Sequence, residues 1–277
     1  MKAPRVLAWT NPHTTELVLT DGAPDRPNYT LIEHTPHFYL HAKTALGMLG
    51  AAVATTLARR CEVDYAQLLS WFGVTPGELP FHVYVADDVS GAMHYGCADT
   101  EIYIGVIPGG SPSSNIYCLL LAALVAEVFE ATGQIGWNCG CSNGEGLSRV
   151  LACALYPSEE CRNLVTAPAW LDRTPPNTPN RFNWVDRNES TDTDKYSVGC
   201  AVLFLNWLHT IEGYSWTVIA RTAGNTLGET FRRLSQGQDG WTRFSDYINK
   251  RWPPARPSGV TSDNPFLTGQ SEDIDNS

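Results

Sequence analysis

The stretch "ALVAEVFEATGQIGWNCGCSNGEGLSRVLACALYP", residues 123–157, decides the fold and raises the question of function. Its pattern predicts an almost wholly apolar helix, then a glycine-rich turn, then a second helix. Glu127, Glu130 and Glu145 lie in these helices, where the hydrophobic pattern places the core. Acidic side chains are almost never fully buried unless they are paired, and unpaired ones often carry out chemistry. The three acids are therefore the first candidates for a functional site.

Two interpretations of Glu127 and Glu130 follow from helical geometry. At 100° per residue they lie about 60° apart and share one edge of the helix with Ala126. That edge could simply face water, as acids on an amphipathic helix usually do. It could instead line a cleft, because the rest of the edge is apolar, with Tyr117, Leu120 and Ala123. Ser142-Asn-Gly-Glu145 also matches a capping box, in which Glu145 would accept a hydrogen bond from the Ser142 backbone N–H.

The remaining pattern predicts an α+β fold, with an N-terminal mixed β-sheet and helices followed by a mainly α-helical C-terminal lobe. Strand-like runs occur at residues 5–9, 16–20, 29–33, 81–86 and 101–106. Helical patterns occur at residues 44–60, 65–72, from 116 onward and 195–213, and Thr226-Leu-Gly-Glu229 offers a further capping box. A long Pro-, Asn- and Asp-rich connection at residues 157–194 separates the helical pattern that begins at residue 116 from the one at residues 195–213.

We expect a single domain over residues 1–252, with the sheet lobe at about 1–132 and the helical lobe at about 133–252. After residue 252 the composition turns to Pro, Ser, Asp and Gly, which predicts a disordered acidic tail over residues 253–277.

Composition limits the classes of partner. The 277 residues carry 19 basic and 29 acidic side chains, for a net charge of −10, and no basic stripe is evident in the sequence. This argues against nucleic acid and membranes as partners. The first residues lack a signal-peptide pattern, so we expect a cytoplasmic protein. In that compartment most of the eight cysteines are expected to be buried thiols, and Cys139 and Cys141 are the only close pair.

The motif "LVAEVFE…NGEGLSRVLA" resembles the core of the gluzincin branch of the zincin metallopeptidases. In that family an HExxH helix is followed by a second helix that bears a glutamate ligand. Residues 196–216, "YSVGCAVLFLNWLHTIEGYSW", resemble the helix that those proteins place behind the site, and the resemblance covers about residues 30–250. It implies a zincin-like fold.

The resemblance also implies roles for individual residues. Glu127 falls on the general-base glutamate, Glu130 on the second histidine ligand and Glu145 on the glutamate ligand. Ala126 occupies the position of the first histidine, so the HExxH motif is degenerate and reads AEVFE. Because zinc favours a ligand set such as two histidines and a glutamate, zinc-dependent peptide hydrolysis is not expected.

Three further residues are candidates. His94 lies just before the strand that lines the cleft in the family resembled, so it is either a second acid/base group or a surface histidine. Tyr196 precedes the apolar helix and is either a hydrogen-bond donor to a substrate oxyanion or a core tyrosine. Tyr95, next to His94, is the other candidate for substrate binding.

Clustered carboxylates either share protons or bind a hard cation. The first alternative predicts a pseudo-metallopeptidase-fold enzyme without a cofactor, which uses Glu127, Glu130, Glu145 and His94 for acid/base chemistry on a small organic or peptide-derived substrate. The second predicts a metal-dependent hydrolase with Mg²⁺, Mn²⁺ or Ca²⁺ held by Glu130, Glu145 and His94. The third alternative is a non-catalytic pseudopeptidase that binds a partner in the cleft.

Overall fold

A six-stranded β-sheet and a series of helices make up the part of the chain that the computed structural model describes. The described residues are 5–7, 26–133, 136–157, 159–173, 181–191, 193–254 and 256–267. The strands lie mainly in the first part of the chain and the helices dominate after residue 116, so the α+β class predicted from the sequence is confirmed.

The sheet is mixed, with strand order β1-β5-β6-β4-β3-β2. Its three middle strands, β6, β4 and β3, run parallel, whereas β2, β5 and β1 pair antiparallel with their neighbours. The bounds are β1 (Arg5–Leu7), β2 (Tyr29–His34), β3 (Phe38–Lys43), β4 (Phe81–Ala86), β5 (Ala92–His94) and β6 (Glu101–Gly105). The strand predicted at residues 16–20 lies outside the described residues.

The short strand β5 was not predicted, because its glycine-rich surroundings indicate a loop. It forms because the backbone groups along the edge of β6 need partners. Met93 pairs with Tyr103 and Ala92 with Ile104. A strand of three residues is too short to show alternation in the sequence, but it fixes which way His94 points.

The helices are α1 (Gly47–Ala58), α2 (Cys61–Phe72), α3 (Ile116–Gly133), α4 (Ser142–Leu155), α5 (Ala167–Leu171), α6 (Lys195–Thr210), α7 (Trp216–Arg221), α8 (Leu227–Leu234) and α9 (Gly240–Arg251). The connection predicted over residues 157–194 lies between α4 and α6, and its described part contains a 3₁₀ helix (Glu159–Leu164) and α5, which were not predicted. Half of the capping box predicted for α8 forms: the Glu229 backbone N–H donates to Thr226 Oγ1 over 3.1 Å, but Glu229 Oε2 accepts from the backbone N–H of Asn225 rather than from that of Thr226.

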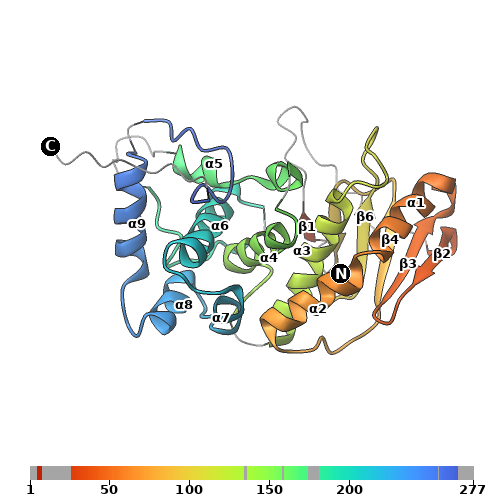
Figure 1. Cartoon of the computed structure of the whole chain (residues 1–277), viewed down its shortest axis with the longest axis horizontal. Helices are drawn as coiled ribbons and strands as arrows, with labels where there is room; N and C mark the ends of the chain where they lie inside the picture. The colour runs from red at the N-terminus through yellow and green to blue at the C-terminus, as the bar shows by residue number, and fades with distance from the viewer. Residues whose placement is uncertain are drawn as a thin grey trace.

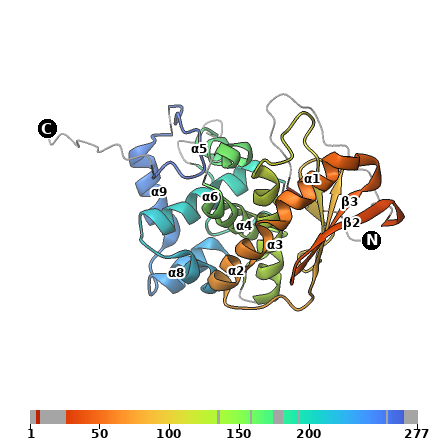
Figure 2. The ribbon, with the colours of Figure 1, turned by 45° about the vertical axis from the view of Figure 1, so that its right-hand side comes forward.

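The layers explain why α3 is apolar all round. Helices α1 and α3 pack against one face of the sheet, α3 also packs against α4, and α4 packs against α6 (Figures 1 and 2). A helix enclosed on every side has no water-facing stripe and is hydrophobic around its whole circumference. Polar groups on α3 are therefore placed in the interior of the molecule.

The disordered tail predicted from residue 253 is wrong for residues 256–267, which pack on the helical lobe. Asp263 Oδ1 accepts hydrogen bonds from the backbone N–H groups of Thr166 and Ala167 over 2.8 and 2.7 Å. The Phe266 ring lies against the rings of Tyr247 and Trp252. Composition alone missed these long-range contacts, and residues 268–277 of the predicted tail lie outside the described residues.

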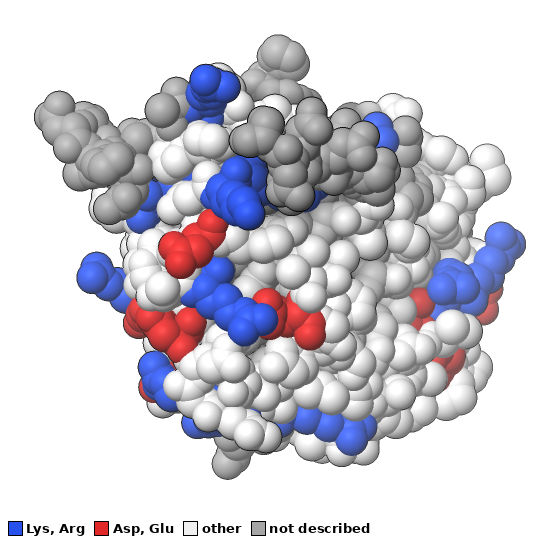
Figure 3. Space-filling model, turned by 60° about the vertical axis from the view of Figure 1, so that its left-hand side comes forward, with Lys and Arg blue, Asp and Glu red and all other residues white. Residues whose placement is uncertain are grey.

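Charged side chains on the face over the helical lobe are mixed in sign (Figure 3). In the helical lobe, Arg243 forms a salt bridge to Glu212 over 2.8 Å. Within the described residues, none of the helices is both long enough and apolar enough to cross a bilayer.

Candidate active site

Helix α3 carries Glu127 and Glu130 into the core. Their exposed fractions are 2% and 0%. The interpretation of these acids as a water-facing edge is therefore wrong, because α4 covers the edge that the sequence left open. Burying ionisable groups is costly unless they are paired or neutralised, so the partners of each carboxylate matter.

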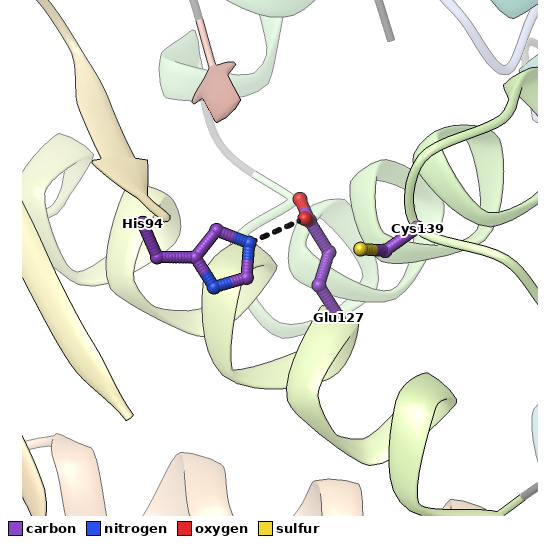
Figure 4. A group of neighbouring side chains, drawn as sticks. All are labelled: His94, Glu127 and Cys139. Carbon is purple, nitrogen blue, oxygen red and sulfur yellow. Dashed lines mark hydrogen bonds and ion pairs between the residues drawn. The ribbon is translucent and has the colours of Figure 1, made fainter. Parts of the chain in front are cut away.

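Glu127 forms a buried pair with His94. Glu127 Oε2 lies 2.8 Å from His94 Nε2, and the histidine side chain is fully buried (Figure 4). His94 is the last residue of β5 itself, rather than a loop residue before the strand, so the surface interpretation of this histidine is wrong. Side chains alternate across a strand, and Met93 packs on the sheet face that holds Tyr84 and Tyr103. His94 therefore points to the opposite face, toward α3.

The pair favours the protonated form of His94. Burial alone would lower the pKa of His94, but the hydrogen bond and negative charge of Glu127 outweigh this effect. The backbone carbonyl of Asp99, 3.4 Å from Nδ1, acts in the same direction, and the pKa is raised above its ordinary value of 6.5. The two groups can hold a proton between them in a dry environment.

Glu130 differs from Glu127 in its surroundings. Within the described residues, neither of its oxygens has a hydrogen-bond partner, although the side chain is fully buried. Burial, then the negative charges of Glu127 and Glu145, raise the pKa of Glu130 well above 4.5, and the nearby backbone N–H of Ser148 opposes this weakly. The neutral acid is thus the favoured form of Glu130.

Gly144, in the first turn of α4, makes room for the Glu130 carboxyl group. A Cβ atom at this position would lie 2.5 Å from Glu130 Oε2 and 2.3 Å from the backbone of Asn138. The absence of a side chain at Gly144 therefore allows the acid on α3 to approach α4.

Glu145 is paired with a residue that the sequence analysis did not single out. Arg149 Nε donates to Glu145 Oε1 over 2.6 Å, and both side chains are buried. The signal was present, since an acid four residues before an arginine is a favourable pair on a helix. The predicted capping box is wrong: Cys141 is the N-cap residue, and the Ser142 backbone N–H donates to the Glu189 carbonyl instead.

The third side chain beside the His94–Glu127 pair is Cys139, from the segment that leads into α4. One ligand atom from each of His94, Glu127 and Cys139 lies within 4.8 Å of the others, and all three side chains are buried. Cys139 forms a disulfide with Cys97, from the loop after β5. The expectation of buried thiols is wrong for these two cysteines, whose 42-residue separation gives no sequence signal.

The two tyrosines proposed for substrate binding lie elsewhere. Tyr95 packs with Tyr103 on the opposite sheet face from His94. Tyr196 is half-buried in the first turn of α6, where its ring lies 3.8 Å from the Arg173 guanidinium carbon. The structure thus brings together Glu127, Glu130, Glu145 and His94 but not the tyrosines.

A zinc ion does not fit the ligand positions that the family resemblance implies. Ala126 has no donor atom, and the Arg149 guanidinium, held against Glu145, opposes a cation there. The same positive charge argues against the alternative hard-cation site on Glu130, Glu145 and His94. No protein-family model, curated protein or solved structure matches the chain.

Proposed function

We propose that the chain is an acid/base enzyme on a zincin-like scaffold whose zinc signature is degenerate. Its substrate is a small organic or peptide-derived molecule. The observation that carries the proposal is the buried 2.8 Å pair of His94 Nε2 and Glu127 Oε2 beside a second carboxyl group, Glu130, that has no hydrogen-bond partner among the described residues. Two acids held in different environments can act as one base and one acid.

Glu127 and Glu130 take opposite roles in this proposal. Glu127, which is hydrogen-bonded to His94, acts as the base. It accepts a proton either from the substrate or from a water molecule that attacks the substrate. Glu130 in its neutral form donates a proton to the negative charge that develops. His94 holds the Glu127 carboxylate and stabilises its charge. The Glu145–Arg149 pair positions the cluster and keeps its net negative charge low.

Access to the site depends on the segments around it. The four side chains, His94, Glu127, Glu130 and Glu145, are each at most 2% exposed. The substrate therefore reaches them only when the packing around these side chains opens locally, while the Cys97–Cys139 disulfide keeps the loop after β5 joined to the segment before α4. This favours a small substrate. The proposal includes no nucleic-acid partner and places the protein in the cytoplasm.

The test is a turnover screen that compares matched variants. Chromogenic amides, esters and short peptides are offered to the parent, Glu127→Gln and His94→Gln. We expect Glu127→Gln to lower any turnover by at least about 100-fold, since general acid/base catalysis contributes 10²–10⁴-fold. The control is Glu62→Gln, because Glu62 forms the same kind of pair with His37 over 2.8 Å in a partly exposed position. Turnover should be unchanged in this control.

A second readout needs no substrate. The His94 ring is titrated by NMR in the parent and in Glu127→Gln. In the parent its pKa lies above 6.5, and in the variant burial should lower it below 6.5, because the hydrogen bond to a carboxylate and its charge are lost. Parent-like turnover or an unchanged His94 titration in Glu127→Gln would rule the proposal out and favour a pseudopeptidase that only binds a partner.

A further inference from the structure

The Cys97–Cys139 disulfide lies beside the His94–Glu127 pair. Its Cys139 sulfur is one of three neighbouring atoms that could be metal ligands, together with one atom each of His94 and Glu127. His94 comes from β5, Glu127 from α3 and Cys139 from the segment before α4. Figure 4 shows the Cys139 sulfur pointing toward the Glu127 carboxylate. In the disulfide this sulfur is bonded to Cys97 and is not available as a thiolate ligand.

The donor set would suit a borderline-soft divalent ion once that sulfur is released. Imidazole nitrogen, carboxylate oxygen and thiolate sulfur are all zinc ligands, and three protein ligands leave a fourth position for water. Tetrahedral bonds of about 2.0–2.3 Å put ligand atoms roughly 3.3–3.8 Å apart. The donor atoms lie within 4.8 Å of one another, so side-chain movements of about an ångström would form the site.

The charges also match. A thiolate beside the Glu127 carboxylate places two negative charges in a buried space, which is costly without compensation. A divalent cation neutralises both, and the His94 ring coordinates as the neutral imidazole. This set differs from the positions implied by the zincin resemblance, because it uses neither residue 126 nor Glu130 and Glu145.

We infer that His94, Glu127 and Cys139 form a site for a divalent metal of the zinc type, which becomes available when the Cys97–Cys139 disulfide is reduced. A dithiol is the reductant. One of its thiolates attacks the sulfur of Cys97, which is the more exposed of the two cysteines, and Cys139 leaves as a thiolate. The second reductant thiol then releases Cys97, so the dithiol becomes a disulfide while two electrons and two protons pass to the cysteines. On metal binding the Cys139 thiol loses its proton to solvent.

The inference does not rest on the proposed acid/base function, because metal binding is measured without a substrate. Its consequence for that function is a switch. In the disulfide form His94 and Glu127 can exchange protons, whereas in the reduced, metal-bound form both are ligands.

The test is a Co²⁺ titration of the full-length chain, followed by competition with Zn²⁺. The parent is measured as purified in the disulfide form, and again after reduction with a phosphine that is removed anaerobically; the phosphine becomes its oxide and water supplies the oxygen and the protons. We expect about one equivalent of Co²⁺ with a thiolate-to-cobalt charge-transfer band in the reduced chain only. Cys97→Ser should bind the ion without any reductant, because it frees Cys139 permanently.

Variants identify the ligands. Cys139→Ser should remove the charge-transfer band, and His94→Gln and Glu127→Gln should each weaken binding by at least about 100-fold, more than the 10–100-fold typical of groups that only support a ligand. Cys141→Ser, two positions from Cys139 and not disulfide-bonded, is the matched control and should bind like the parent. The parent in its disulfide form measures any Co²⁺ binding by the cysteines that are not disulfide-bonded, because these are thiols before and after reduction.

Two outcomes would overturn the inference. One is that neither the reduced parent nor Cys97→Ser, both folded by circular dichroism, binds more Co²⁺ than the disulfide parent. The other is that His94→Gln and Glu127→Gln bind as tightly as the parent, which would assign the ion to other cysteines. Turnover by Glu127→Gln tests only the proposed function. It does not change the interpretation of the Co²⁺-binding measurements.

Discussion

At the scale of single residues, Glu130 shows how the interior accommodates a buried carboxyl group in its neutral form. A buried carboxyl group without a hydrogen-bond partner is tolerated when it stays neutral, because the cost of desolvation falls mainly on the ionised form. Gly144 allows this group to contact α4, while Glu127 has His94 and Glu145 has Arg149. Of the three acids, Glu130 alone has its hydrogen-bonding capacity left unused by the described residues.

Replacing Glu130 with Gln should make stability less dependent on pH. The folded-state pKa of Glu130 is raised, so the folded chain binds more protons than the unfolded chain from about pH 4.5 up to the raised value. Stability of the parent falls as pH rises through that window, by up to about 1.4 kcal/mol per pH unit from this group. Glu130→Gln should therefore gain stability relative to the parent as pH rises above 4.5. Denaturant unfolding at several pH values from 4 to 8 measures the difference.

Glu62→Gln is the control, because the pKa of Glu62 is lowered whereas that of Glu130 is raised. Burial raises the pKa of Glu62, but hydrogen bonds from Thr35 and His37 outweigh burial and lower it. An acid with a lowered folded pKa contributes stability above its unfolded pKa and loses that contribution as pH falls through the folded value. This variant should lose stability relative to its parent above pH 4.5. Parallel pH curves for the parent and Glu130→Gln would contradict the account of Glu130.

At the scale of elements, the packing of α3 on α4 decides the geometry of the site. The first turn of α4 lies against the Glu130 carboxyl group and against Asn138, with no space for a methyl group at Gly144. Gly146 makes a similar close contact with α6. A Cβ atom added to Gly146 would lie 2.6 Å from the Ala201 side chain. Two glycines thus let α4 sit between α3 and α6.

Gly144→Ala should destabilise the fold even though alanine is the better helix former. The gain in helix propensity is about 1 kcal/mol, whereas the new Cβ would meet backbone atoms of Asn138 at 2.3 Å, which requires the segment before α4 to move. Overpacking costs about 1–3 kcal/mol, and a contact with backbone atoms belongs to the upper part of this range, so we expect a net loss of up to about 2 kcal/mol. Thermal and denaturant unfolding measure it, with Gly77→Ala as the control because no atom lies within 4 Å of its added Cβ. Equal stability of the two variants would show that α4 does not pack as described.

The elements also show what could be predicted from the sequence. Long apolar runs predicted α3 and α6, because hydrophobic periodicity and length are local properties. The carboxylate cluster followed from the spacing of Glu127 and Glu130 together with the family resemblance. The features that were missed depend on distant partners: β5 on the edge of β6, the Ser142 N–H on Glu189, and Cys97 on Cys139. A local pattern contains no record of such pairings.

At the scale of the whole molecule, a segment at the far end of the chain completes the helical lobe. Thr166 is the N-cap of α5, but its side chain makes no capping hydrogen bond. Asp263 supplies the acceptor, and its backbone carbonyl in turn accepts a hydrogen bond from Asn206 of α6 over 2.9 Å. Composition predicted disorder here because it does not reveal that a distant helix lacks a cap.

Removing this acceptor should destabilise the lobe. Asp263→Ala leaves the backbone N–H groups of Thr166 and Ala167 without their partner, and a lost cap or a buried unsatisfied donor costs about 1–3 kcal/mol. We expect a total loss of about 2 kcal/mol, within the range for a lost cap with buried donors. Asp263→Asn keeps an acceptor oxygen and should lose less than Asp263→Ala. The control is Asp246→Ala on the exposed side of α9, which should change stability by no more than about 0.5 kcal/mol.

The pH dependence of the asparagine variant identifies the mechanism. Burial raises the pKa of Asp263 to about 6, although the N–H groups of Ala167 and Thr166 and the charge of Arg149 oppose it. For an acid with a raised folded pKa, stability falls as pH rises from about 3.8 to about 6. Asp263→Asn does not lose stability in this pH range. The amount by which it is less stable than the parent should therefore be smaller at pH 7 than at pH 4. Unfolding at the two pH values decides the matter: a deficit that grows toward pH 7 would mean that the ionised carboxylate, rather than a neutral acceptor, holds the C-terminal segment on α5.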